Sequence, residues 1–460
     1  MDEQARAAAA EQQPGQQPEH QPEHQRSRHP VVVIGAGPVG LAAAVHLLQR
    51  GLEPLVLEAG PTAGSAIGQW RHIRLFSPWR FNLDPAAVRL LEASGWEAPR
   101  PTALPYGGEI VDRYLAPLAA LPQIAPRLQT GARVVAVTRA GLDRTHSRDR
   151  EGTPFSVRAR NADGTVREVT AAAVIDASGT WSTRNPLGTS GLPATGEPEA
   201  EARISAPLPD VVGRDRARFG GRRALVVGAG HSAANTLIAL AELARAEPET
   251  RILWAVRGAS AQKAYGGGDA DGLPARGQLG SRLRRLVEAG TVELHTGFGI
   301  SSLKALDSHV TVEAVDGRTL EADVVVPCTG FRPDLGILRE LRLELDPAVE
   351  APRELGPLID PEFHSCGTVP PHGARLLAHP EKDFYIVGMK SYGRAPTFLL
   401  ATGYEQVRSV AAALAGDRAA ADTVQLELPE TGVCSTDVGT GCDAPEPAAQ
   451  DCCATEGIPS

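Results

Sequence analysis

The sequence predicts an α/β protein with two parallel-sheet domains, one of them inserted into the other. Two stretches of the 460-residue chain, beginning at Val31 and at Ala224, share one order of elements: an apolar strand, a glycine-rich turn, a helix and a second strand. Short runs of valine, isoleucine and leucine are typical of strands buried on both faces of a parallel sheet. We therefore expect two Rossmann-like dinucleotide-binding domains.

The first unit joins a strand at 31–34 to the turn Gly35-Ala36-Gly37-Pro38-Val39-Gly40 and a helix that ends near Gly51. In G-x-G-x-x-G the first glycine permits the turn, the second lets backbone approach a pyrophosphate, and the third lets helix and strand pack closely. The helix N-terminus offers free N–H groups to the phosphates. A second strand at 54–57 ends in an acid that can accept a hydrogen bond from a ribose hydroxyl. The residues predicted to bind the dinucleotide are Gly35, Gly37, Pro38, Gly40 and Glu58.

The second unit has a strand at 224–227, the turn Gly228-Ala229-Gly230-His231-Ser232-Ala233 and a strand at 252–256. Arg257 follows that strand, where the first unit has an acid. A guanidinium suits a 2′-phosphate, which favours NADPH over NADH. A surface arginine unrelated to the cofactor is the alternative. We expect Gly228, Gly230, Ser232 and Arg257 to bind NADPH, and interpret His231 as a side chain tolerated beside the phosphates.

Two dinucleotide folds in one chain are typical of electron transfer from nicotinamide to flavin. Residues 173–180 and 323–331 are each an apolar strand ending in a small-residue turn, and they bracket the second unit. We therefore expect an NADPH domain inserted into a discontinuous FAD domain. The predicted division is a disordered leader at 1–29, the FAD domain at 30–180 and 325–420, the NADPH domain at 181–324, and a Cys-rich flexible tail at 421–460.

Composition narrows the class of protein and its partners. Lys plus Arg number 46 and Asp plus Glu 55, a net charge of −9, without a run of basic residues. This balance argues against nucleic acid and anionic membranes as partners. We find neither a signal-peptide core near the start nor an apolar run of ~18 residues, so we expect a cytoplasmic protein acting on a small molecule. The oligomeric state stays open, with a homodimer as the common form among soluble proteins.

On these motifs the chain resembles the flavin-containing monooxygenases, a group of the two-dinucleotide-binding-domain flavoproteins, over roughly residues 30–415. Further segments that carry the resemblance are Gly68-Gln69-Trp70-Arg71, Ala177-Ser178-Gly179-Thr180-Trp181-Ser182, Cys328-Thr329-Gly330-Phe331-Arg332-Pro333-Asp334 and Phe384-Tyr385-Ile386-Val387-Gly388. Two departures are visible. The group's F-x-G-x-x-x-H fingerprint has no match between about 200 and 215, and Gly388-Met389-Lys390 replaces the usual Gly-Asp near the flavin.

The resemblance also implies site residues. Gly68, Gln69 and Trp70 would lie along the FAD ribityl and diphosphate, and Val134 would offer backbone to the adenine. The turn with Ser178 and Gly179 would contact the cofactor. Residues near the isoalloxazine would be Gly330, Asp334, Gly388 and Lys390.

The activity implied by the resemblance is that of an NADPH-dependent flavin monooxygenase. Hydride would pass from NADPH to FAD, and a flavin C4a-hydroperoxide formed with O2 would oxygenate a soft nucleophile: sulfur, nitrogen or trivalent arsenic. Asn82 is the catalytic candidate, because the group often places an asparagine amide near the flavin C4a; a structural role in its loop is the alternative. Residues 388–398 and 401–407 and the Cys-rich end further resemble monooxygenase-like flavoproteins encoded beside arsenic-resistance genes.

Two other functions compete with this one. A thioredoxin-reductase-like disulfide or metalloid reductase needs two cysteines close together beside the flavin, whereas Cys328 and Cys366 are each solitary. Paired thiols occur in the tail, which could take electrons from the flavin. A non-enzymatic redox sensor that binds a metalloid through thiols is the other alternative. The candidate soft ligands for As(III) are Cys434, Cys442, Cys452 and Cys453.

Overall fold

The computed structural model describes residues 29–266, 274–362, 369–395 and 398–426. Residues 1–28 of the predicted leader, Cys366 and the four tail cysteines lie outside these described residues. The expectations placed on them therefore remain predictions.

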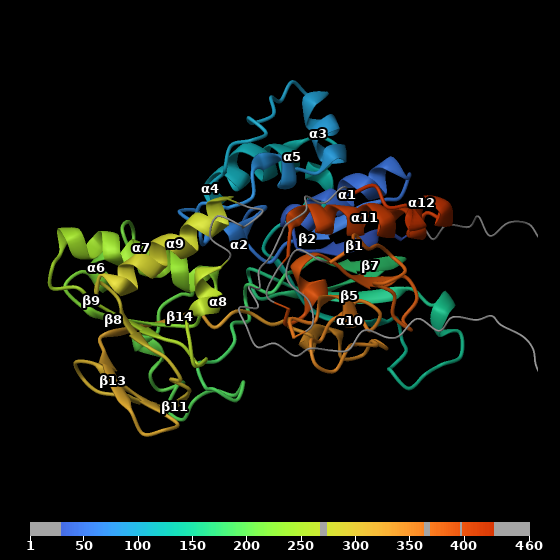
Figure 1. Ribbon diagram of the computed structural model, residues 1–460. Coiled ribbons are helices and arrows are strands. Elements are labelled where there is room, and N and C mark those ends of the chain that lie inside the picture. Colours follow the sequence, from blue (N-terminus) through green and yellow to red (C-terminus); the bar gives the residue numbers. More distant parts are fainter. Residues whose placement is uncertain (1–28, 267–273, 363–368, 396–397, 427–460) are drawn as a thin grey trace, which may run out of the picture.

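Five parallel strands form the first sheet, in the order β15-β7-β1-β2-β3 (Figure 1). Their bounds are β1 Val31–Ile34, β2 Pro54–Leu57, β3 Leu128–Gln129, β7 Ala173–Asp176 and β15 Phe384–Ile386. The predicted strands at 31–34 and 54–57 are confirmed. From β1 the chain builds outward through β2 and β3, and later strands are added on the opposite side of β1. The strand order therefore reverses between β1 and β7, which makes this the place where a parallel sheet binds ligands.

The two faces of this sheet are covered differently, as alternate residues of β1 show. Val31 and Val33 pack in a core with helices α1 (Pro38–Gln49) and α11 (Leu400–Leu414). Val32 and Ile34 pack in a core with an antiparallel sheet. That sheet consists of β4 (Ala132–Arg139), β5 (Phe155–Asn161) and β6 (Val166–Ala171). Burial on both faces explains the continuous apolar run that identifies β1 in the sequence.

The first domain also carries a group of short helices, of which α3 and α5 are seen at the top of Figure 1. They are α2 (Ser65–Gly68), α3 (Pro85–Glu92), α4 (Gly107–Ile110), the π-helical turn η2 (Val111–Leu115) and α5 (Ala116–Ala120). At the C-terminal end, α12 (Arg418–Asp422) packs on α11. Further short helices of this domain include α10 (Gly356–Ile359) and the 3-10 helix η8 (Gly388–Tyr392).

The second sheet has four parallel strands in the order β10-β9-β8-β14. Their bounds are β8 Arg223–Val227, β9 Arg251–Ala255, β10 Glu293–His295 and β14 Val324–Pro327. Its helices are α6 (Arg216–Phe219), α7 (His231–Ala246), α8 (Gln262–Tyr265) and α9 (Pro274–Glu288). An antiparallel sheet of β11 (Ile300–Ala305), β12 (Val310–Ala314) and β13 (Thr319–Ala322) packs on it. The protein is thus α/β with two Rossmann-like sheets, as predicted.

The strand β14 belongs to the second sheet. It pairs with β8 along its length, from Val324 opposite Ala224 to Pro327 opposite Val227. The domain boundary predicted from the sequence, between 324 and 325, falls inside this strand. The sequence could not place it better, because an apolar strand has the same pattern whichever of the two sheets it joins. We accordingly propose that the second part of the FAD domain begins after residue 327, and keep the other boundaries as proposed.

Two neighbouring segments link the domains. Arg184 and Phe331 form an antiparallel bridge, and the Asn185 N–H donates to the Gly330 carbonyl over 2.9 Å. The Asn185 amide donates to the Thr329 carbonyl over 3.0 Å, and the Thr329 hydroxyl donates to the Asn185 carbonyl over 2.6 Å. The chain leaves the first domain and returns to it at the same place, consistent with an inserted domain.

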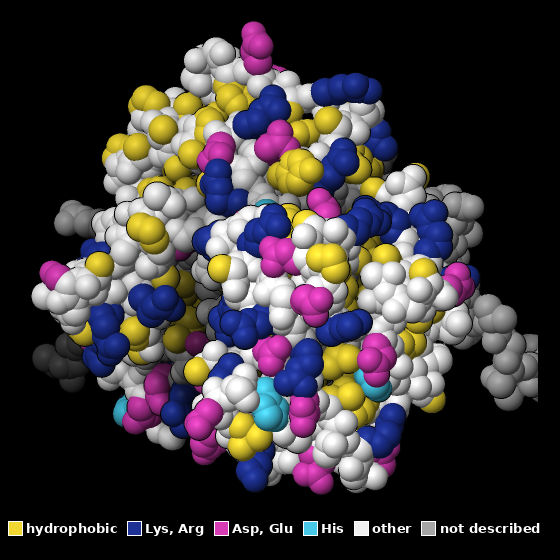
Figure 2. Space-filling model, turned by 90° about the vertical axis from the view of Figure 1, so that its left-hand side faces the viewer, with side chains coloured by type: hydrophobic (Ala, Val, Ile, Leu, Met, Phe, Trp, Pro, Cys, Tyr) yellow, Lys and Arg dark blue, Asp and Glu magenta, His cyan; other side chains and the backbone are white. Residues whose placement is uncertain are grey.

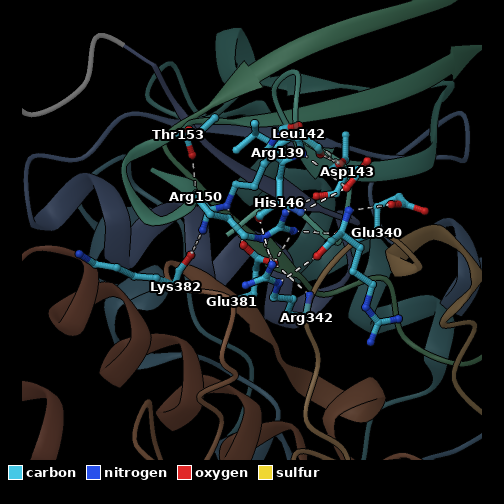
Figure 3. A network of polar contacts seen from close by, with 12 residues as sticks. Arg139, Leu142, Asp143, His146, Arg150, Thr153, Glu340, Arg342, Glu381 and Lys382 are labelled. Atoms are coloured by element: carbon cyan, nitrogen blue, oxygen red, sulfur yellow. Dashed lines mark hydrogen bonds and ion pairs between the residues drawn. The ribbon is translucent and has the colours of Figure 1, made fainter. Parts of the chain in front are cut away.

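A buried ionic network joins the β4–β5 hairpin to the segment before β15 (Figure 3). Arg139 and Arg150 each pair with Glu381, at 2.7 and 2.8 Å, and all three side chains are at most 4% exposed. Burial favours the neutral acid, but hydrogen bonds from Arg150, from the Arg342 N–H and from Arg139 outweigh it and lower the pKa of Glu381. The network fixes the entry to β15 and thus the position of η8.

The face of the second domain carries lysine, arginine and acidic side chains interspersed over its surface (Figure 2). Charges of both signs therefore lie side by side on this face. Among the described residues, none of the helices is both long enough and apolar enough to cross a membrane.

Candidate cofactor and active site

The glycines of the first turn meet the geometric demands predicted for them. Gly35 has φ of 98°, and a Cβ there would lie 2.9 Å from the Ala177 carbonyl oxygen. A Cβ on Gly40 would lie 1.9 Å from the Gly35 carbonyl oxygen. Gly37 has no heavy atom within 4 Å of its Cβ position, so its backbone is open to a ligand. The turn therefore leaves room for a pyrophosphate at one glycine while packing tightly at the other two.

The N-terminus of α1 completes this crevice. Gly37 is its N-cap, with no side-chain cap, and Pro38 occupies the first turn. The first N–H groups of the helix are thus available to phosphate oxygens, which the helix dipole also favours. The residues present fit the diphosphate of a dinucleotide.

Glu58 lies directly beside the glycine turn. Its two carboxylate oxygens accept hydrogen bonds from the Ala36 and Gly60 N–H groups, each over 2.7 Å. A carboxylate can accept about four hydrogen bonds, so capacity remains for a ribose hydroxyl. The role of Glu58 toward ribose stays a prediction.

The second crevice repeats the arrangement. Gly228 has φ of 125°, and a Cβ on it would lie 2.1 Å from the Cys328 carbonyl oxygen. Gly230 has open space and caps α7 without a side-chain cap. Ser232 lies in the first turn of α7. His231 packs its ring against Phe76 of the first domain, with centroids 5.0 Å apart, so this side chain lies at the domain interface.

Arg257 follows β9 at the edge of the second crevice. Its side chain is exposed, and its guanidinium donates to the Thr189 carbonyl over 3.2 Å. A single hydrogen bond leaves most of its five donors for another partner. This position suits the proposed contact with a 2′-phosphate.

The residues Gly68, Gln69 and Trp70 lie at the end of α2, facing the link between the domains. The Trp181 indole N–H donates to the Gln69 side-chain oxygen over 2.9 Å. Trp181 also lies against Trp70 and Phe331, with ring centroids 6.4 and 4.9 Å away. The structure thus brings three of the resemblance motifs together in one aromatic cluster.

Lys390 is fully buried, contrary to what its charge would suggest. Its ammonium lies 2.7 Å from Asp176 Oδ2 and 3.1 Å from Ser178 Oγ. Asp176 ends β7, so this group lies where the strand order reverses. Sequence reasoning did not single out Asp176 as a site residue, although an acid at the end of an apolar strand, before a small-residue turn, was a usable signal.

The other cofactor candidates are spread around the first domain and its link. Gly179 (φ 70°) and Gly330 (φ 84°) are turn residues, and the Asp334 side chain accepts from the Gly336 N–H. Gly388 (φ 67°) donates its N–H to the Gln406 side-chain oxygen over 2.7 Å. Val134 is buried in β4, just before a register shift. Their cofactor contacts remain predictions.

Asn82 is held inside its own loop. Its amide nitrogen donates to the Ser77 and Pro78 carbonyls, and its oxygen accepts from the Ser77 hydroxyl. The residue is 1% exposed. These bonds give Asn82 the structural role in its loop that the sequence analysis named as the alternative to catalysis. To act on the flavin, the amide would have to leave these partners.

A cleft of about 500 Å³ opens between the domains beside Gly68 and Gln69. His72 spans it, with Nε2 3.1 Å from the Pro209 carbonyl oxygen. The charged residues that line it are Arg71, Glu109, Asp112, Asp210 and Arg214. Acids and arginines together make this a polar cavity of mixed charge.

Cys328 is the one cysteine among the described residues. It is 5% exposed, and burial raises the pKa of its thiol to about 12. The structure shows no cluster of three or more metal-ligating side chains within the described ranges. The described residues therefore offer neither a reactive thiol pair nor a metal centre.

Comparisons with known proteins now decide the family. Residues 29–351 match the family model described as pyridine nucleotide-disulphide oxidoreductase. The chain belongs to this family. Proteins of this family use FAD and NAD(P)H, and the two crevices provide sites for both cofactors.

Solved structures with the same fold include both reductases and oxygenases. Bacillithiol disulfide reductase of Bacillus cereus is 19% identical, with a TM-score of 0.61 over 84% of this chain and 99% of that one. The FAD-bound cadaverine monooxygenase of Erwinia amylovora is 14% identical, with a TM-score of 0.58 over 89% and 99%. The ornithine hydroxylase of Pseudomonas aeruginosa is 16% identical, with a TM-score of 0.57 over 85% and 99%. A search of curated proteins gave no match.

Proposed function

We propose that this flavin oxidoreductase is an NADPH-dependent monooxygenase that oxygenates a small soft nucleophile. The observation that carries the proposal is the state of Cys328. A disulfide reductase of the thioredoxin-reductase type needs two cysteines close together beside the flavin, and the one described cysteine is buried in the second domain. With both cofactor crevices present and no described thiol acceptor, O2 is the favoured electron acceptor.

Residues of this chain would bind the two cofactors and limit the access of water to the site between the domains. The N-termini of α1 and α7 would hold the two diphosphates, and Arg257 would select NADPH through its 2′-phosphate. The half-buried Trp70–Trp181–Phe331 cluster lies at the link between the domains, where it would limit the access of water. When bound, FAD supplies the capacity to accept hydride and to activate oxygen.

The substrate would enter through the cleft between the domains. Arg71 is paired with Asp112 at 2.5 Å, and Arg214 with Asp215 at 3.3 Å, so the positive charges there are already neutralised. Glu109 lies at the same opening, paired with Arg113 only at 3.6 Å. This lining favours a small polar nucleophile, such as an amine or a trivalent arsenical, over a lipophilic one.

A thiol-dependent reductase is the second candidate, favoured by the shared fold with bacillithiol disulfide reductase. It would use the tail cysteines Cys434, Cys442, Cys452 and Cys453, which could also bind As(III). Replacing all four by serine separates the two functions. Loss of NADPH turnover in that variant would favour the reductase, whereas unchanged turnover with every substrate favours the oxygenase.

The direct experiment follows NADPH oxidation by the purified, flavin-loaded protein. Sulfides, amines and trivalent arsenicals are offered in turn, and the oxygenated product is measured beside hydrogen peroxide. The proposal requires one class of substrate to give product in step with NADPH use. Peroxide alone with every class would refute it.

A further inference from the structure

The buried ion pair of Asp176 and Lys390 lies at the opening of the first cofactor crevice. Asp176 stands opposite Ile34 on one side and Ile386 on the other. Gly35, the first residue of the phosphate turn, directly follows Ile34. The Cα of Ser178 would lie 3.1 Å from a Cβ on Gly35, so the turn after β7 touches the phosphate turn.

Every side-chain oxygen and nitrogen of Asp176, Ser178 and Lys390 takes part in a hydrogen bond. Asp176 Oδ1 accepts from the Ser178 N–H over 3.0 Å and from the Ser178 hydroxyl over 2.6 Å. Asp176 Oδ2 accepts from Lys390, which also donates to Ser178 Oγ. The side chains of Lys390 and Asp176 are 1% and 0% exposed, while Ser178 is exposed at the surface above them. The serine therefore connects a buried pair of charges to the crevice.

A buried ion pair of this kind contributes little net stability, because the cost of desolvating both charges offsets their attraction. Its hydrogen bonds are directional, however, and they fix the chain segments that carry them. Here they tie the turn after β7 to η8, which begins at Gly388. Gly388 in turn lies against Val39 of α1: a Cβ built on Gly388 would be 3.3 Å from Val39 Cγ2.

We propose that Asp176, Ser178 and Lys390 form a positioning triad that holds the turns 178–179 and 388–390 in the arrangement that binds FAD. Lys390 belongs to the Gly388-Met389-Lys390 segment, where the resemblance leads one to expect Gly-Asp. The role of the triad rests on FAD binding, and it stands whether the reduced enzyme passes electrons to oxygen or to a thiol.

The test compares FAD affinity and thermal stability in full-length holoenzymes. The double variant D176N/K390M removes both charges, and Ser178→Ala keeps both charges but removes the bridging hydroxyl. The matched control is E405Q/R408M, which removes another buried ion pair, 2.7 Å apart, on α11. Free and bound FAD are separated by ultrafiltration, and Tm is measured with and without added FAD.

We expect D176N/K390M to raise the Kd for FAD about tenfold or more relative to the control, the effect of losing charge-assisted hydrogen bonds. Ser178→Ala should raise it less, with little change in Tm without added FAD. If both variants bind FAD as tightly as the control, the triad has no positioning role. The same holds if, across the two variants and the control, every loss of FAD affinity is matched by a proportionate loss of Tm without added FAD. Should the double variant fail to fold, unchanged FAD affinity in Ser178→Ala overturns the proposal.

Discussion

A Cβ atom on Gly40 would lie 1.9 Å from the carbonyl oxygen of Gly35, so α1 packs against the phosphate turn too closely for any side chain at this position. Replacing Gly40 by alanine forces the helix away from β1, and overpacking of this kind costs about 1–3 kcal/mol. We expect Gly40→Ala to lose bound FAD, measured as flavin per protein after purification. Gly152→Ala is the control, because that position has no neighbour within 4 Å. Full flavin content in both variants would contradict the assignment.

Arg257 should decide between the two nicotinamide cofactors. Removing a guanidinium that binds a 2′-phosphate weakens NADPH binding without affecting chemistry, so Arg257→Ala should raise KM for NADPH about tenfold at nearly constant kcat. KM for NADH should stay unchanged. Arg251→Ala, at the other end of β9, serves as control. An equal effect on NADPH and NADH, or none on either, would show that Arg257 does not bind the 2′-phosphate.

Cys328 should be chemically inert in the folded protein. The thiolate is the reactive form of cysteine, and a pKa raised to about 12 leaves almost none of it at neutral pH. Mass spectrometry of the peptide containing Cys328 should show no alkylation in the native protein and full alkylation in urea. Cys328→Ala should keep NADPH turnover. Rapid native labelling, or loss of turnover, would reopen a thiol role for this residue.

His372, which is buried, and His379, which is half-buried, should make the stability of the protein depend on pH. Burial lowers the pKa of His372 from 6.5, and that of His379 to about 4. His372 Nε2 accepts a hydrogen bond from the Gln406 amide over 2.9 Å. Protonation of Nε2 would therefore point its new N–H at the Gln406 N–H and break this hydrogen bond. A group with a lowered folded pKa stabilises the protein fully above its ordinary pKa, and this contribution is lost as pH falls.

We therefore expect Tm to fall as pH drops from about 6.5 toward 4, and the double variant H372N/H379N to show a flatter profile in that window. Glu381, whose pKa is lowered by its arginines, should add a further loss at lower pH in both proteins. A double variant with an unaltered profile above pH 4.5 would show that these histidines do not carry the effect.

The sequence predicts well those features whose residues are adjacent in the chain. Val31 to Ile34 and Gly35 to Gly40 are adjacent in the chain, and their pattern requires one strand, one turn and one helix start. The pairing of Asp176 with Lys390 spans 214 residues, and no pattern in either segment indicates it. The partner of β14 was likewise invisible, because an apolar strand fits either sheet. Asn82 shows the same limit, since its partners depend on a loop fold that spacing does not specify.

The measurement that tests the central claim most directly is NADPH oxidation under isotopically labelled O2, with product analysis for each class of soft nucleophile. The account predicts that one class yields product carrying one labelled oxygen atom for each NADPH consumed. NADPH consumption that yields only hydrogen peroxide, or that proceeds without O2 when a disulfide is supplied, would contradict it.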